Sequence, residues 1–113
     1  MRCFLAAKIH DLRVTEKVLL YEGSVAIDAG LMQAAGIAPY EQVHVINTNT
    51  GNRWVTYALP AGQGVFSLNG GGARLGEIGD RCIVLTYRFQ QFHSDAQVIY
   101  CDEDNRIAKR LTY

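Results

Sequence analysis

The sequence carries no excess of charge, because eleven Lys and Arg residues balance eleven Asp and Glu residues over 113 positions. Proteins that bind nucleic acid or an anionic membrane surface usually have a basic excess or a basic stripe. Neither is present here, so these two classes of partner are not expected. A site for an anion must instead be built locally, from a few cationic side chains or backbone N–H groups.

Cysteines are few and long apolar runs are missing. Cys3, Cys82 and Cys101 are odd in number, and no two have Cys-x-x-Cys spacing. We therefore expect buried free thiols and a reducing compartment rather than a disulfide framework. Only five apolar residues separate Arg2 from Lys8, fewer than the about 7–15 of a secretory signal. No apolar run approaches the ~18 residues of a membrane span, and we expect a cytoplasmic protein.

The motifs of common cofactors are also missing. His10, His44 and His93 stand far apart, and no His-Glu-x-x-His or Cys/His cluster occurs, so no metal site is expected. The glycine-dense segment 69–73 lacks the Lys-Ser/Thr of a P-loop and the spacing of a dinucleotide fingerprint. Two interpretations of it stay open. It is a tight turn into a short helix, which the sequence alone favours, or a row of N–H groups that binds an anion.

The sequence does contain many short apolar runs separated by glycine and asparagine, a pattern typical of β structure. Its length predicts one domain, 1–113. Since closure removes exposed sheet edges, many short strands with one or two small helices predict a mainly β fold, a compact β-barrel. The strands are expected at residues 2–9, 12–20, 24–28, 42–48, 53–59, 65–69, 81–89, 96–101 and 106–112.

One good helix candidate covers residues 29–35, with Asp28 as its N-cap and Gly36 as its end. A second short helix is expected at residues 73–78. Residues 47–52 and 102–105 are expected to be turns, the first with Gly51 at positive φ.

In the strand 53–59, alternation places Arg53 and Tyr57 on one face and Thr56 on the other. Arg53 can hold a carboxylate through two parallel hydrogen bonds, and Tyr57 can transfer a proton. The alternative is a barrel strand whose polar side chains face solvent. The residues of this strand alone favour the alternative.

The Gly23-Ser24 pair lies between two apolar runs. A serine hydroxyl can attack the carbonyl of the preceding residue and convert the peptide bond into an ester. Amide resonance resists this reaction, so the bond must be strained and the oxyanion must meet donors. Glycine before the serine tolerates strained φ and leaves its carbonyl open. A Gly-Ser pair is a turn in nearly every case, so the pair alone favours a turn and only allows the reaction.

A set of short segments changes this balance when it is taken in order through residues 1–89. The segments are Ala7-Lys8-Ile9-His10, Val14-Thr15, Tyr21-Glu22-Gly23-Ser24, Ile27-Asp28, Ala34-Ala35-Gly36-Ile37, Gly51-Asn52-Arg53, Thr56-Tyr57-Ala58, Asn69-Gly70 and Gly79-Asp80. In this order and spacing they resemble the pyruvoyl-dependent aspartate 1-decarboxylase (aspartate α-decarboxylase) family. Beyond Arg88 the likeness is looser, around residues 98–107.

The resemblance implies a double-ψ β-barrel, assembled as a homotetramer with active sites between subunits. It also implies an inactive precursor that cleaves itself between Gly23 and Ser24. Elimination from the ester then turns Ser24 into a pyruvoyl group, a covalent cofactor that replaces pyridoxal phosphate and needs no metal. The products would be a β chain of residues 1–23 and an α chain of residues 24–113.

The resemblance also implies roles for individual residues. In processing, Ser24 supplies the attacking hydroxyl, Thr56 places its hydroxyl near the Gly23 carbonyl, and Asn69 orients the site. In catalysis, Tyr57 donates a proton, and His10 lies close to the site. Lys8 and Arg53 hold substrate carboxylate, and Thr56 places its hydroxyl near the substrate. The substrate is also contacted by the main chain of Gly70, Gly71 and Gly72.

The implied reaction converts L-aspartate to β-alanine and CO₂ through a Schiff base to the pyruvoyl group, which supplies β-alanine for pantothenate and coenzyme A synthesis. Two rivals stay open: an uncleaved, non-enzymatic barrel that acts as a binding or assembly module, and an enzyme for another acidic amino acid such as glutamate. One methylene gives only about 1–3 kcal/mol of discrimination. A maturation factor is a further possible partner. The chain departs from many relatives at Gly71-Gly72, where alanines are common, and at Leu20, where several carry a polar residue.

Overall fold

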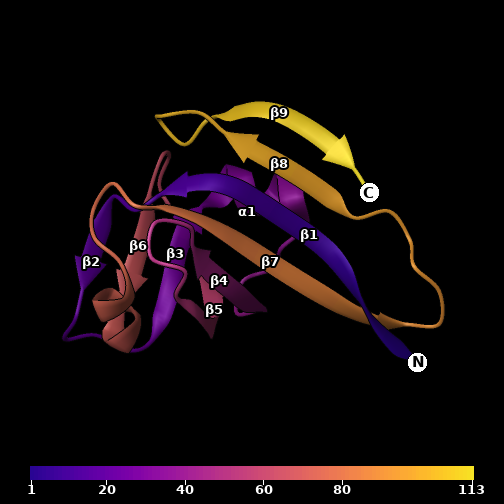
Figure 1. The fold of residues 1–113 in the computed structure, drawn as a ribbon, viewed down its shortest axis with the longest axis horizontal. Helices are drawn as coiled ribbons and strands as arrows, with labels where there is room; N and C mark the ends of the chain where they lie inside the picture. Colours follow the sequence, from indigo (N-terminus) through magenta and orange to yellow (C-terminus); the bar gives the residue numbers. More distant parts are fainter.

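The computed structural model describes all 113 residues as nine strands, one α-helix and one 3₁₀ helix (Figure 1). The predicted mainly β fold is confirmed, and from residue 24 onward every predicted strand is present with bounds within two residues. The elements are β1 (Arg2–Arg13), β2 (Glu16–Val18), β3 (Ser24–Asp28), α1 (Ala29–Ala35), β4 (Gln42–Asn47), β5 (Arg53–Ala61), β6 (Phe66–Asn69), η1 (Gly70–Leu75), β7 (Arg81–Gln90), β8 (Gln97–Cys101) and β9 (Ile107–Thr112).

The first two strands were predicted wrongly. The expected break after residue 9 does not occur, because β1 continues to Arg13 across a register shift against β7 between Ile9 and Leu12. Asp11 lies at φ 60 within this shift, a left-handed conformation that aspartate tolerates, so the chain forms a bulge instead of a turn. The second strand is also shorter than expected, since only Glu16–Val18 pairs with β6.

The strands form one connected sheet in the order β2-β6-β3-β5-β4-β7-β1-β8-β9. Strand pairs β1/β8, β2/β6 and β3/β5 are parallel and the others are antiparallel. Strands from both halves of this order bury side chains in a single core, so the sheet wraps around it as a barrel does. The double-ψ topology stays a prediction. Core residues with at most 1% exposure include Ile9, Leu12, Val25, Ile27, Val43, Val45, Phe66, Leu68, Val84 and Ile99.

Helix α1 begins and ends as predicted. The Asp28 Oδ1 accepts hydrogen bonds from the backbone N–H groups of Gly30 at 2.7 Å and Leu31 at 3.3 Å, which satisfies two free donors of the first turn. Gly36 ends the helix at φ 75, a conformation that glycine adopts without steric cost. Gly51 likewise lies at φ 83 in the predicted turn after β4.

The second helix differs from its prediction. The expected helix at residues 73–78 is instead the 3₁₀ helix η1, Gly70–Leu75, which starts directly after β6. The glycines are therefore inside the helix rather than in a turn before it. Gly76 ends η1 with extended backbone, and a Cβ there would lie 2.9 Å from Leu68 Cδ1 and 3.1 Å from Asn47 Nδ2. The helix thus ends earlier than its sequence pattern suggests, at a position where close packing leaves room only for glycine.

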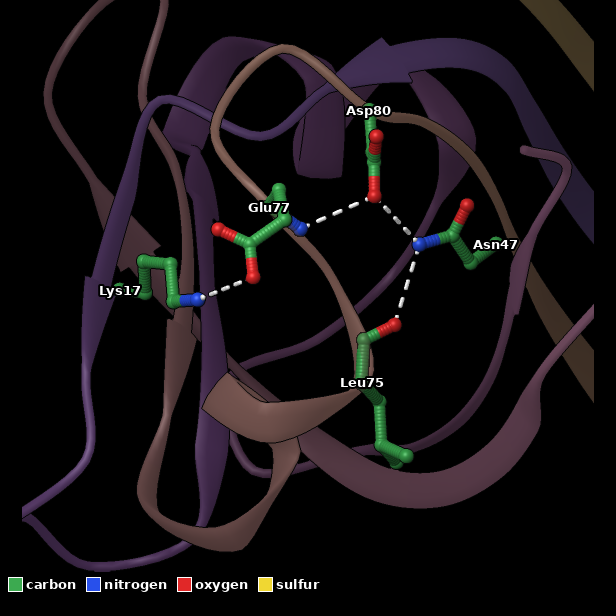
Figure 2. A network of polar contacts seen from close by, with 5 residues as sticks. All are labelled: Lys17, Asn47, Leu75, Glu77 and Asp80. Carbon is green, nitrogen blue, oxygen red and sulfur yellow. Dashed lines mark hydrogen bonds and ion pairs between the residues drawn. The ribbon is translucent and has the colours of Figure 1, made fainter. Parts of the chain in front are cut away.

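A polar network holds the end of η1 against β4 and β2 (Figure 2). The fully buried Asn47 donates from Nδ2 to the Leu75 carbonyl at 3.0 Å and to Asp80 Oδ2 at 2.9 Å. The Glu77 N–H also donates to Asp80 Oδ2, and the Glu77 carboxylate pairs with Lys17 at 3.1 Å. The hydrogen bond from Glu77 N–H, and then that from Asn47, lowers the pKa of Asp80. The network fixes η1 close to the segment that precedes Ser24.

Two further expectations concern the cysteines and membrane segments. All three cysteines are free as predicted, but Cys3 is exposed, which corrects the expectation that every thiol is buried. Burial raises the pKa of Cys82 and of Cys101 to about 12. No helix has both the length and the apolar character needed to cross a membrane.

Candidate active site

Ser24 is the first residue of β3 and lies directly opposite Asn69, the last residue of β6. Its side chain is only 2% exposed, and its Oγ accepts a hydrogen bond from Asn69 Nδ2 at 3.0 Å. The other end of the amide is also held, because Asn69 Oδ1 accepts from Ser67 Oγ at 2.8 Å. The structure therefore brings two predicted processing residues, Ser24 and Asn69, into direct contact.

Gly70 presses its backbone against the expected cleavage segment. It lies at φ 69, and a Cβ added there would be 2.8 Å from Gly23 Cα and 3.0 Å from the Tyr21 carbonyl oxygen. Only glycine satisfies both the positive φ and this approach. Gly23 itself has no positive φ, and a Cβ there would meet no atom within 4 Å. The steric requirement for glycine that the sequence suggested at Gly23 is thus found at Gly70 instead.

A cleft of about 410 Å³ opens onto this contact. Its wall includes Tyr21 from the segment before Ser24, Glu16 from β2, and both Ser67 and Asn69 from β6. The side chains of Ser24, Ser67 and Asn69 are buried, but the cleft gives solvent access to the edge of this hydrogen-bonded group.

Thr56 approaches the same region from β5. Strands β3 and β5 are parallel, with Val25 beside Ala58, so Thr56 lies level with Gly23 two positions before this ladder begins. Thr56 pairs with Val43, whose side chain is in the core. The Thr56 side chain therefore lies on the core face of β5, and its contact with the Gly23 carbonyl stays a prediction.

Arg53 and Tyr57 lie on the opposite, outer face of β5, as alternation predicts. The β4/β5 ladder runs from Gln42–Tyr57 to Ile46–Arg53 without a register shift, so no bulge turns Tyr57 toward Thr56. Thr56 and Tyr57 therefore lie on opposite faces of β5 within one chain.

The outer face has its own polar contacts. Arg53 Nη2 donates to the Tyr87 hydroxyl at 3.1 Å and lies 3.3 Å from His44 Nδ1. The Tyr57 ring stacks on Tyr40, with centroids 6.1 Å apart. Arg53 is exposed and Tyr57 is half-buried, so both are available to a molecule bound on this face.

Lys8 lies farther along the same face. Cross-strand pairing joins Lys8 to Leu85, Leu85 to His44, and His44 to Val55, and residues paired directly across a sheet share a face. Three strand spacings separate Lys8 from Val55, or about 14 Å. Its ammonium group lies 5.7 Å from the centre of the Tyr113 ring. One chain therefore keeps Lys8 apart from Ser24, whereas the β3/β5 register places Ser24 beside Tyr57 on the same face.

His10 is half-buried and stacks on Tyr100, with ring centroids 4.5 Å apart and an interplanar angle of 11°. Burial, and secondly the charge of Lys8, lowers the pKa of His10. Its buried Nε2 has no hydrogen-bond partner. The ring is accordingly neutral at pH 7 and keeps one polar atom free.

The two departures from the family pattern have different settings. Gly71 is exposed with open space around it, whereas a Cβ on Gly72 would lie 3.1 Å from Trp54 Nε1. The missing side chain at Gly72 therefore makes room for the indole of Trp54. Leu20 is 94% exposed, so its apolar side chain has no packing role within the chain.

Three residues of these groups were missed by sequence reasoning. Ser67 stands two residues before Asn69 in β6, and alternation already places both on one face, so a signal existed. His44 was considered only as a metal ligand, and Tyr87 was not considered. Their contacts with Arg53 depend on the pairing order of β5, β4 and β7, which local sequence does not reveal.

Comparison with known proteins shows the family to which the chain is similar. The family model described as aspartate decarboxylase matches residues 1–108. Aspartate 1-decarboxylase of Acaryochloris marina is 48% identical over 94% of this chain and 86% of the relative. Aspartate 1-decarboxylase 2 of Gloeobacter violaceus is 48% identical over 95% and 90%, and aspartate 1-decarboxylase of Syntrophobacter fumaroxidans is 49% identical over 93% and 90%. The chain belongs to the aspartate decarboxylase family.

Proposed function

We propose that this protein decarboxylates L-aspartate to β-alanine and CO₂, with a pyruvoyl group made from its own Ser24. Membership in the family supports the reaction. The observation that carries the proposal is the buried Ser24 hydroxyl, held by Asn69 at 3.0 Å and directly preceded by Gly23. When present, the pyruvoyl carbonyl supplies an electron sink for the electron pair left on the substrate when CO₂ departs.

The first part of the proposal is self-cleavage into residues 1–23 and 24–113. The Ser24 Oγ forms a bond to the Gly23 carbonyl carbon, the Gly23–Ser24 C–N bond breaks, and the hydroxyl proton ends on the freed nitrogen. Loss of the Ser24 α-proton and departure of the Gly23 carboxylate from Cβ then leave an unsaturated residue. Water replaces its nitrogen, which leaves as ammonia. Thr56 lies level with Gly23, where its hydroxyl would stabilise the oxyanion.

The second part concerns substrate binding. Aspartate has two carboxylates, and Arg53 and Lys8 are the cations on the outer face that can hold them, with Arg53 as a two-donor fork. Tyr57 would supply the proton that replaces CO₂. We place the main chain of Gly70, Gly71 and Gly72 along the bound substrate, with the exposed Gly71 most open to it.

The separation of Lys8 from Ser24 supports an assembly. The β3/β5 register places Ser24 beside Tyr57 on the outer face, whereas Lys8 lies on β1, four strand spacings from β3 in the sheet, or about 19 Å. Since one chain does not bring Lys8 to Ser24, we propose that Lys8 of one subunit serves the Ser24 of a neighbouring subunit in a homotetramer. We also expect the enzyme in the cytoplasm, where its free thiols stay reduced.

An intact-mass measurement under denaturing conditions, followed by an aspartate assay, tests the proposal. Two species, the larger beginning at position 24 with a ketone-bearing end, and release of β-alanine are expected. A Ser24→Ala control must stay at full length, because alanine has no nucleophile. A wild-type chain that stays whole after incubation, alone and with a cell extract, would instead favour the non-enzymatic barrel. Cleavage that needs the extract would identify a maturation factor as a partner.

A further inference from the structure

Three side chains are joined by hydrogen bonds at Ser24, and one of them, Ser67, has no role so far in the proposed reaction. Ser67 is 3% exposed, and its only side-chain hydrogen bond is to Asn69 Oδ1 at 2.8 Å. Ser67 and Asn69 lie two residues apart on one face of β6, and Asn69 faces Ser24 across the β3/β6 pair. The three side chains thus form a line from Ser67 through Asn69 to the nucleophile.

The direction of this line matters once the ester forms. A free hydroxyl at Ser24 can donate or accept, so before the reaction the line could run either way. The acylated oxygen has lost its proton and only accepts. Asn69 must then present Nδ2 to it, as the structure shows, which turns Oδ1 toward Ser67. At that stage Ser67 has to be the donor.

A donor on this oxygen is useful for one particular step. During elimination the Cβ–Oγ bond of Ser24 breaks, the electron pair goes to Oγ, and Gly23 leaves as a carboxylate. The Asn69 N–H stabilises the negative charge that develops on this oxygen. Asn69 can do so only while its amide is held in the right orientation.

We infer that Ser67 is a positioning residue for self-processing, which fixes the Asn69 amide so that it donates to the leaving oxygen in the elimination step. This inference rests on the proposed function and deepens it. It separates the two halves of processing: ester formation depends on Ser24 itself, whereas loss of Gly23 from the ester depends on Ser67 through Asn69.

The test follows newly made precursor over time by intact mass, for the wild type and for Ser67→Ala. Each sample is denatured and treated with hydroxylamine, which attacks an ester at Gly23 to give a hydroxamate on residues 1–23 and a free serine amine on residues 24–113. We expect Ser67→Ala to process about tenfold more slowly than the wild type. The loss is expected to be smaller than the 10²–10³-fold loss of rate when an oxyanion donor is removed outright. Its uncleaved fraction should be rich in hydroxylamine-sensitive ester.

Matched variants separate orientation from general damage. Ser67→Thr keeps the hydroxyl donor and should process at a rate near that of the wild type, while Ser67→Cys keeps the volume with a weak donor and should be intermediate. Ser94→Ala removes an exposed hydroxyl on a distant loop and should change nothing. If Ser67→Ala fails to fold, the Thr and Cys variants still give the ordering.

The outcomes distinguish this inference from the proposed function. Wild-type protein that never cleaves would overturn the proposed function. Wild-type protein that cleaves while Ser67→Ala cleaves equally fast would overturn only the role of Ser67. Slow cleavage of Ser67→Ala without ester accumulation would also overturn it, because the defect would then precede elimination. Slow cleavage that Ser67→Thr does not restore would overturn it as well, because the defect would then not depend on the hydroxyl donor.

Discussion

The processing group and the substrate-binding residues differ in how complete they are within one chain. Ser24 is buried and hydrogen-bonded to Asn69, and Gly70 packs against Gly23 and Tyr21 just before it. Lys8, by contrast, lies on β1, four strand spacings from β3 in the sheet, or about 19 Å. The processing group can be assembled by folding alone. We expect the substrate-binding group to be completed only when another chain brings its Lys8 to Ser24.

This difference suggests that processing and turnover are separable by mutation. Changes in the processing group should act on cleavage, and changes in the substrate-binding residues should act on decarboxylation of cleaved enzyme. A variant that affected both equally would remove the distinction between the two groups.

The largest effect is expected from Gly70→Ala. A Cβ would lie 2.8 Å from Gly23 Cα, at a φ of 69 that side chains rarely adopt, a strain of about 1–3 kcal/mol. We expect uncleaved precursor to accumulate, measured by intact mass over time. Gly71→Ala is the matched control, since its Cβ would meet no atom within 4 Å, and it should cleave normally. Equal cleavage of the two variants would contradict the proposed contact.

Tyr57→Phe tests the substrate-binding group. Cleavage should proceed as in the wild type, because the proposed cleavage step takes no proton from Tyr57. Decarboxylation should fall by about 10²-fold or more, in the range that a positioned proton donor contributes. The measurement is β-alanine release per processed chain. Undiminished turnover would show that Tyr57 is not the proton donor.

Arg53→Lys should give a smaller, more specific change. Lysine keeps the charge but loses the two-donor fork, so KM for aspartate should rise by about tenfold, as expected for roughly 1–2 kcal/mol of lost charged hydrogen bonding. The extent of cleavage should not change. Arg2→Lys, on an exposed position of β1, serves as the control. If KM stays the same, the carboxylate is bound elsewhere.

The smallest effect is expected where Trp54 meets η1. Gly72→Ala places a Cβ 3.1 Å from Trp54 Nε1, and shifting the indole should cost on the order of 1 kcal/mol of stability. In a Trp54→Leu background the same substitution should be nearly neutral. Thermal unfolding of the four proteins measures this coupling. Additive effects would show that Gly72 is not an adaptation to Trp54.

The strands and α1 were predictable because alternation, the Asp28 cap and the Gly36 end are local signals. The extent of β1 and η1 was not, because both depend on partners distant in sequence. Asp11 sits in a bulge defined by β7, and Asn47 binds the Leu75 carbonyl that ends η1.

The candidate site likewise has features that the sequence predicted and features that it could not predict. The contact between Ser24 and Asn69 was expected from the family resemblance, and the Ser67 contribution could have been found from alternation in β6. The separation of Lys8 from Ser24 could not, because it follows from the strand order rather than from any motif. Similarly, no local pattern showed that Gly70, rather than Gly23, is the glycine required by close packing.

The most direct test is complementation between two inactive variants. Ser24→Ala keeps Lys8 but has no nucleophile, and Lys8→Ala is expected to cleave but lacks the cation that holds a substrate carboxylate. When the two are produced together, mixed assemblies pair a processed Ser24 from one chain with Lys8 from another, and we predict that decarboxylation returns well above the level of either variant alone. Mixed assemblies with no more activity than the parents would contradict an active site shared between neighbouring chains.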